Sequence, residues 1–311
     1  MTETSDTPDP VRFSHALANG TLAGLAWPNP GSPRLVFIHA NGFCASAYKR
    51  LLGRLAPRFD IIAPDLRGHG RSRLPTDPDN HRSWALYAQD VLDWLKQLDR
   101  PADAFAGHSM GAIVALLSAS AAADTAPLAL IEPVILPPVF YLTAASPFRG
   151  LIKGRIPIAN AARKRFDGWA SPADAHARYV RHRTFRNWAE GVLDDYLEDG
   201  LTRAEDGMYH LSCTPGWEAA NFEAQGHDIG AALRRHRGPI RVLGAERAST
   251  IVNPRTLTRR GIVIDRMAGT GHLAPLEVPD RVAAWLGDCL AAGPRESGNP
   301  GNGPLEAQDH G

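Results

Sequence analysis

Short apolar runs alternate with longer stretches in which apolar residues recur at helical spacing. The apolar runs occupy 35–38, 60–63, 102–106, 128–131, 240–243 and 261–264, and the helical patterns lie at about 47–55, 84–95, 112–123 and 279–290. Strands that alternate with helices predict βα units and a mostly parallel sheet, which is an α/β fold. Two further runs, at 11–16 and 21–27, predict an antiparallel hairpin at one edge.

The alternation is lost between Pro137 and His227, where no run predicts a strand. We expect this stretch to be a helical insertion between two strands, and such insertions cover the active sites of α/β sheets. The predicted division is therefore a core over 11–136 and 228–292 and a helical cap over 137–227. The ends, 1–10 and 293–311, hold almost no large apolar residue, so we expect both to be disordered.

Composition mainly excludes classes of function. The 311 residues include 34 basic and 33 acidic side chains, so the net charge of +1 favours neither nucleic acid nor an anionic membrane as partner. No 18-residue apolar stretch predicts a membrane span, and the polar N-terminus does not resemble a signal peptide, which favours the cytoplasm. Three cysteines, far apart, predict neither a disulfide framework nor a zinc site, and no metal or cofactor motif is present.

The strongest chemical signal is Gly107-His-Ser109-Met-Gly111, which lies between a predicted strand and a predicted helix. A G-x-S-x-G in that context is a nucleophile elbow, a sharp turn that exposes the serine hydroxyl. The turn leaves no room for side chains two positions before and after the serine, and both positions are glycine. The N–H groups that follow would stabilise an oxyanion at the helix N-terminus.

With this motif the chain resembles the α/β-hydrolase superfamily, from about residue 11 to residue 290. Three further motifs support the resemblance in the expected order: 36–43 (VFIHANGF), 65–72 (DLRGHGRS) and 269–272 (GTGH). The first resembles the superfamily's oxyanion loop, the second its turn after the next strand, and the third its catalytic-histidine loop. Serine at position 109 excludes the chemistry of epoxide hydrolases and dehalogenases, whose elbow residue is aspartate.

His272 is the expected general base, because it follows the last strand and the order Ser, acid, His is that of the superfamily. A serine hydroxyl needs such a base, and imidazole titrates near neutral pH. Three other histidines lie inside the motifs, and we expect these to support loops: His39, His69 and His108.

Two residues compete for the acid of the triad. Glu132 ends the strand after the elbow, which is where the carboxylate of haloalkane dehalogenases is placed. Glu246 follows the later strand, where most of the superfamily has an aspartate, but here the loop 244–250 contains no aspartate. We favour Glu132 and keep Glu246 as the alternative. Arg247 could hold Glu246 in a surface ion pair.

The oxyanion hole requires two backbone donors. The N–H of Met110, directly after the nucleophile, is one. The resemblance gives two alignments for the other, and these point to the N–H of Asn41 or to that of Phe43. The side chain of Asn41 could donate as well, or it could instead fix the loop.

The predicted cap is rich in basic and aromatic residues. We expect the basic residues to form a solvated helix surface, and the alternative is that they steer an anionic substrate. They are Arg155, Arg163, Lys164, Arg165, Arg178, Arg181, Arg183 and Arg186. The aromatic residues could line an acyl pocket or pack the cap onto the core, and they are Phe140, Tyr141, Phe166, Trp169, Trp188 and Trp217.

The resemblance implies a serine hydrolase that cleaves a small-molecule carboxylic ester through an acyl-enzyme intermediate, with a Ser-His-Glu triad and no cofactor. The same triad would serve another acyl bond, such as a thioester, a lactone or the carbon–carbon bond of a diketone. A ligand sensor with slow turnover is the alternative from another class. Patterning indicates neither the acyl chain nor the oligomeric state.

Overall fold

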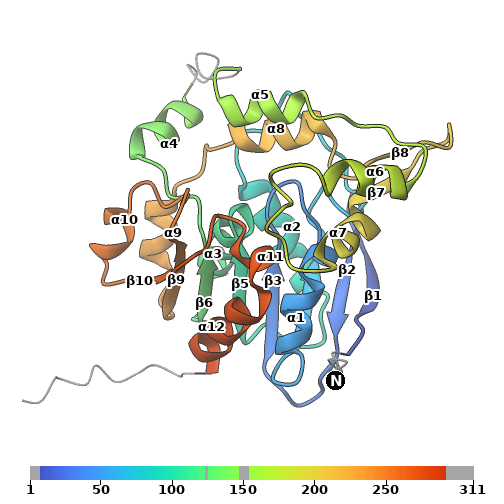
Figure 1. Ribbon diagram of the computed structural model, residues 1–311. Coiled ribbons are helices and arrows are strands. Elements are labelled where there is room, and N and C mark those ends of the chain that lie inside the picture. Colours follow the sequence, from blue (N-terminus) through green and yellow to red (C-terminus); the bar gives the residue numbers. More distant parts are fainter. Residues whose placement is uncertain (1–7, 123–124, 147–153, 292–311) are drawn as a thin grey trace, which may run out of the picture.

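A computed structural model describes residues 8–122, 125–146 and 154–291, and its centre is one eight-stranded sheet (Figure 1). The strand order is β1-β2-β4-β3-β5-β6-β9-β10. The strands are β1 (Val11–Leu17), β2 (Gly20–Trp27), β3 (Arg34–Ile38), β4 (Asp60–Pro64), β5 (Ala104–His108), β6 (Leu128–Ile131), β9 (Ile240–Ala245) and β10 (Val263–Met267).

The first two strands form the predicted hairpin at one edge, and β2 also pairs antiparallel with β4. All remaining pairs, from β4 to β10, are parallel. The central strands β5 and β6 are buried along their whole length, which explains why they read as continuous apolar runs rather than as alternating patterns. The predicted α/β fold with a mostly parallel sheet is confirmed.

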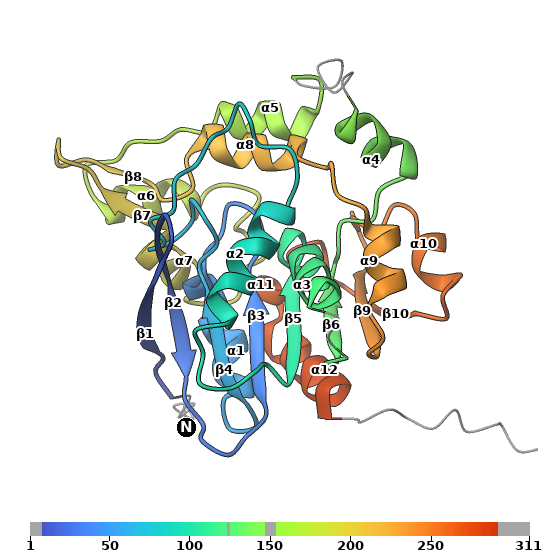
Figure 2. The same ribbon diagram turned by 180° about the vertical axis from the view of Figure 1, so that it is seen from behind.

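Helices cover both faces of the sheet. In Figure 1, α1 and α12 lie in front of it, and Figure 2 shows α2, α3 and α9 on the opposite face. The helices of this part are η1 (Ala45–Tyr48), α1 (Lys49–Leu55), α2 (Ala85–Leu95), α3 (Met110–Ala121), α9 (Ile229–Arg235), α10 (Arg255–Thr258), α11 (Ala274–Glu277) and α12 (Pro279–Ala291). Each face has its own apolar core, one built around α3 and the other around α1 and α12.

Most of the chain between β6 and α9 lies over the carboxyl ends of the parallel strands, as Figures 1 and 2 both show. This is the predicted insertion, and it is mostly helical. Its elements are α4 (Pro138–Ala145), α5 (Pro157–Arg163), α6 (Pro172–Tyr179), α7 (Val192–Gly200), β7 (Leu201–Arg203), β8 (Tyr209–Leu211) and α8 (Pro215–Glu223). The exact bounds of the cap, 137 and 227, stay a prediction.

The expectation that the insertion holds no strand is wrong, because β7 and β8 form a small antiparallel sheet. Each strand has only three residues, so neither shows a periodic pattern that a sequence could reveal. Trp169 and Tyr209 exchange two backbone hydrogen bonds, which attach this hairpin to the segment before α6.

One strand lies later than predicted. The run at 261–264 suggested a strand from Gly261, but β10 is Val263–Met267 and includes Asp265 and Arg266. Asp265 is accommodated because it accepts hydrogen bonds from Arg241 and Trp285. The disordered ends predicted over 1–10 and 293–311 lie outside the described residues, apart from residues 8–10.

Candidate active site

The nucleophile elbow has the backbone geometry that its sequence predicts. Ser109 joins β5 to α3 with φ 56° and ψ −115°, a conformation that non-glycine residues rarely adopt. A Cβ on Gly107 would lie 2.5 Å from the carbonyl carbon of Gly111, and a Cβ on Gly111 would lie 2.2 Å from the carbonyl oxygen of Ile38. Glycine is therefore required at both positions if Ser109 is to project at the end of β5.

Three predicted residues from three strand ends meet beside the elbow. Ser109 follows β5, Glu132 follows β6, and His272 lies in the loop after β10. The Oγ of Ser109 is 3.0 Å from Nε2 of His272, and Nδ1 of His272 is 3.0 Å from Oε2 of Glu132. An ionised carboxylate only accepts hydrogen bonds, so Nδ1–H donates to Glu132 and Nε2 accepts from Ser109.

Glu132 is fully buried, and its carboxylate is surrounded by donors. One oxygen accepts from the N–H of Ala245 and the hydroxyl of Ser249, and the other accepts from the N–H of Thr250 as well as from His272. Burial alone would raise the pKa of Glu132, but these hydrogen bonds outweigh it and lower the pKa to about 2. The carboxylate is thus ionised at neutral pH.

The alternative acid, Glu246, lies in an exposed loop after β9. Its carboxylate accepts the backbone N–H of Gly269 at 2.8 Å, and no hydrogen bond joins it to His272. The suggested ion pair with Arg247 does not form either, since Arg247 donates to the carbonyl of Gly269. Glu246 therefore supports the turn before the histidine loop and does not touch the imidazole.

A buried hydrogen-bond chain supports the same histidine loop from below. The N–H of Ala40 donates to the hydroxyl of Tyr48, which donates to Nδ1 of His108, and Nε2–H of His108 donates to the carbonyl of His272. Burial lowers the pKa of His108 to about 3, so it stays neutral and can donate on one side while it accepts on the other. The role of Tyr48 was not foreseen from the sequence.

The oxyanion loop has few free donors. The N–H of Gly42 donates to Nε2 of His69, and that of Phe43 donates to the carbonyl of Ala40 at 3.2 Å. In the part of the chain that the structure describes, the N–H groups of Asn41 and Met110 donate to no other residue. Of the two candidates predicted in this loop, Asn41 thus keeps its N–H available, while that of Phe43 closes a turn.

Residues of the cap hold the oxyanion loop from above. The side chain of Asn41 donates to the carbonyl of Glu218 at 3.0 Å and accepts from Asn221 at 2.8 Å, so it fixes the loop. The hydroxyl of Tyr196 donates to the carbonyl of Gly42 at 3.3 Å. Sequence reasoning missed these three partners, which lie more than 150 positions away from the loop.

The motif at 65–72 is held in place by its buried charged side chains. Arg67 makes a bidentate ion pair with Asp90 of α2, and both side chains are buried. Asp65 accepts the backbone N–H groups of Ala45 and Arg71. The motif thereby fixes the turn that carries His69, which in turn holds Gly42.

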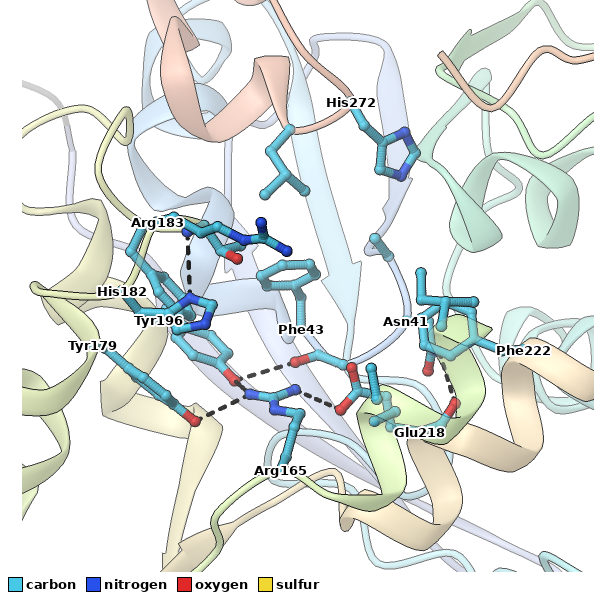
Figure 3. Close-up of a pocket in the computed structure, with 18 of the residues that line it drawn as sticks. Asn41, Phe43, Arg165, Tyr179, His182, Arg183, Tyr196, Glu218, Phe222 and His272 are labelled. Atoms are coloured by element: carbon cyan, nitrogen blue, oxygen red, sulfur yellow. Dashed lines mark hydrogen bonds and ion pairs between the residues drawn. The ribbon is translucent and has the colours of Figure 1, made fainter. Parts of the chain in front are cut away.

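A pocket of about 680 Å³ opens above Ser109 and His272, between the sheet edge and the cap (Figure 3). That volume falls in the range of small-molecule sites. Ser109 and His272 line it together with cap residues. Of the cap aromatics named from the sequence, Phe166 lines the pocket, whereas Trp169 and Trp217 are buried in the packing. The other aromatic residues of the lining are Phe43, Tyr179, Phe185, Tyr196 and Phe222.

The model of the alpha/beta hydrolase family matches residues 35–285, which is most of the chain. The chain belongs to this family. An uncharacterized protein of Mycobacterium bovis is 38% identical over 84 residues. That match covers 27% of this chain and 24% of the relative, so the chain aligns with about a quarter of that relative's length.

Solved structures agree with the fold over nearly the whole chain. An E-2-(acetamidomethylene)succinate hydrolase has a TM-score of 0.71 at 19% identity, with 91% of this chain and 100% of that chain covered. A thioesterase domain from the curacin biosynthetic pathway has a TM-score of 0.69 at 17% identity, with 90% and 99% covered. Within the described ranges, no helix is both long enough and apolar enough to cross a membrane.

Proposed function

We propose that the protein is a serine hydrolase that cleaves a carboxylic ester of a small molecule through an acyl-enzyme intermediate. The observation that carries the proposal is the continuous hydrogen-bonded line from Ser109 through His272 to the buried Glu132, at the floor of a pocket. Membership of the alpha/beta hydrolase family supports a hydrolase.

In the first half of the reaction, Ser109 attacks the ester carbonyl while Nε2 of His272 takes the hydroxyl proton. Glu132 keeps the imidazole in the tautomer that can accept, and it stabilises the imidazolium that forms. The N–H groups of Met110 and Asn41 are the donors that hold the oxyanion of the tetrahedral intermediate. Imidazolium then gives its proton to the leaving alcohol.

In the second half, water enters and His272 takes its proton, so that hydroxide attacks the acyl-serine ester. The second tetrahedral intermediate collapses, Ser109 leaves with the proton from His272, and the carboxylic acid is released. No step uses a cofactor. The pocket has a volume of about 680 Å³ and is lined by several aromatic rings, which suits a small acyl group better than a long polymer.

A thioester is the second candidate, because the same triad acts on it and a thioesterase domain is among the structural neighbours. The other acyl bonds considered, a lactone and the carbon–carbon bond of a diketone, need the same groups. A ligand sensor with slow turnover would not need the aligned line of hydrogen bonds from Ser109 to Glu132.

The proposal is tested with a fluorophosphonate probe and a series of p-nitrophenyl esters of rising chain length. We expect rapid labelling of Ser109, and the Ser109→Ala protein should stay folded but lose ester hydrolysis by roughly 10³-fold or more. Hydrolysis rates of the corresponding acyl-thioesters, measured in parallel, show whether esters or thioesters are the better substrates. Near-normal turnover by a folded Ser109→Ala protein would contradict the mechanism, and slow labelling of the native protein would favour the sensor.

A further inference from the structure

We propose that the pocket selects esters that carry a carboxylate away from the scissile bond, and that Arg183 is the main group that binds it. The inference rests on the proposed function and specifies its substrate class. It starts from the charges that line the cavity. Four lining side chains are cationic, and the only carboxylate among the described lining residues belongs to Glu218.

That one carboxylate is already neutralised inside the protein. Arg165 forms an ion pair with Glu218, and the hydroxyl of Tyr179 accepts another of its N–H groups at 3.0 Å. The pair thus contributes no net charge to the pocket. Three cations remain, on Lys164, Arg178 and Arg183.

These three cations have no acidic partner within the described ranges. Arg178 lies over the ring of Phe166, 4.4 Å from its centroid, and no carboxylate is within ion-pair distance of Lys164 or Arg183. A neighbouring cation of the same segment behaves differently, because Arg163 is paired with Glu223 at 2.7 Å and does not line the pocket.

The pocket walls make these three cations attract an anion more strongly than the same cations would on a convex surface. Apolar side chains, among them Phe43, Phe185 and Phe222, form much of the lining. Walls of low dielectric around charges of one sign focus the field inside a cleft and raise the local concentration of an oppositely charged ligand. In Figure 3 the Arg183 side chain points into the pocket, just above the ring of Phe43 in that view.

Arginine also matches the proposed ligand in shape. Its planar guanidinium presents two parallel N–H groups, which bind both oxygens of a carboxylate. Arg183 is exposed and lines the pocket, and its guanidinium has no ion-pair partner among the described residues, so its donors are free to make this bond. Ser109 lines the same cavity, so one ligand can reach the nucleophile and the cation together.

The basic residues named from the sequence therefore divide into two sets. Arg165, Arg178, Arg183 and Lys164 line the pocket, whereas Arg155, Arg163, Arg181 and Arg186 do not. Arg181 is the matched control for Arg183, because it is two positions away, is also exposed, and has the same charge. If the basic residues only form a solvated helix surface, substitution of either arginine should have the same effect on substrate preference. If the pocket binds a carboxylate, substitution of Arg183 should change that preference and substitution of Arg181 should not.

The kinetic test compares esters of similar size, one with a carboxylate and one without. 4-Nitrophenyl hemiglutarate is paired with 4-nitrophenyl valerate for a carboxylate on the acyl side, and 4-acetoxybenzoate with methyl 4-acetoxybenzoate for the alcohol side. For at least one pair we expect Arg183→Gln to lower the ratio of kcat/KM, charged over neutral, by about tenfold, the worth of a hydrogen bond to a charged group. Arg181→Gln should leave the ratio unchanged, and added salt should lower it in the native protein.

A binding test does not depend on turnover. Calorimetry with the Ser109→Ala protein compares monomethyl glutarate with dimethyl glutarate, and we expect tighter binding of the monoester, lost in Ser109→Ala/Arg183→Gln and kept in Ser109→Ala/Arg181→Gln. Equal behaviour of the two arginine variants, or no preference for charge in either test, would overturn the inference. If no ester is hydrolysed, the proposed function fails, but the calorimetry still decides whether the pocket binds carboxylates.

Discussion

Charged side chains at the sheet edge and on the cap side of the pocket differ in burial and in hydrogen bonding. At the sheet edge, the carboxylate of Glu132 is buried and accepts hydrogen bonds from backbone and side-chain donors on both oxygens. On the cap side of the same pocket, Lys164 and Arg183 are exposed and have no acidic partner among the described residues.

Burial explains the difference. A buried carboxylate without donors would be strongly destabilising, so the loops around Glu132 must keep their geometry for the protein to stay folded. An exposed cation is stabilised by water whether or not it has a partner, and surface ion pairs contribute little to stability. The groups of the proposed reaction are therefore held in place by the fold, whereas the proposed preference for a charged substrate depends on exposed side chains that contribute little to stability.

The largest expected effect tests the sheet edge. Glu132→Gln should lower kcat by about 10³–10⁴, because the imidazole loses the carboxylate that orients it. Glu246→Gln is the control, and its effect on kcat should be small because, among the described residues, the Glu246 carboxylate is hydrogen-bonded to the N–H of Gly269 and not to His272. Both variants are measured on one short-chain ester after circular dichroism has shown that they are folded. If Glu246→Gln lost most of its kcat and Glu132→Gln kept nearly all of it, the acid of the triad would be Glu246, after the later strand. If both variants kept most of their kcat, the enzyme would work with a Ser-His pair.

Hydrogen exchange tests whether the cap is a separate unit. Amides of α5 and α6, which are short helices on the outside of the cap, should exchange about 100-fold faster than those of the buried strands β5 and β6. Mass spectrometry of peptides from each region gives the comparison in one experiment. Uniform protection across the cap and the strands would argue that they open together, and the predicted cap boundaries would then have no energetic meaning.

The smallest expected effect concerns the hold of the cap on the oxyanion loop. Tyr196→Phe removes the hydrogen bond to the carbonyl of Gly42, and we expect kcat to fall by about threefold to tenfold with KM little changed, as for a lost neutral hydrogen bond. Tyr179→Phe is the control, because the hydroxyls of Tyr179 and Tyr196 both accept a hydrogen bond from Arg165, whereas that of Tyr196 also donates to the carbonyl of Gly42. If both variants lose kcat equally, the effect comes from the Arg165 cluster and not from the loop.

The sequence by itself determined the α/β fold, the elbow and the two residues, Ser109 and His272, that the structure joins by a hydrogen bond. These features are encoded locally. Gly107 and Gly111 lie within two positions of Ser109, and a buried strand is apolar wherever it pairs. The hairpin of β1 and β2 was foreseen for the same reason, because its two strands are neighbours in the chain.

Tertiary structure decided which side chains from distant segments meet, including which of the two glutamates proposed from the sequence contacts His272. Glu132 and His272 are 140 positions apart, and only the parallel pairing of β5, β6 and β9 brings the end of β6 beside the elbow. The same holds for Tyr196 above Gly42, which no pattern along the chain connects. It also holds for Arg183 and Arg181, which are equivalent in sequence until the fold of the cap places one of them on a pocket wall. Local patterns record what a segment can become, but a side chain's partners depend on where distant segments pack, and that is settled by the whole fold.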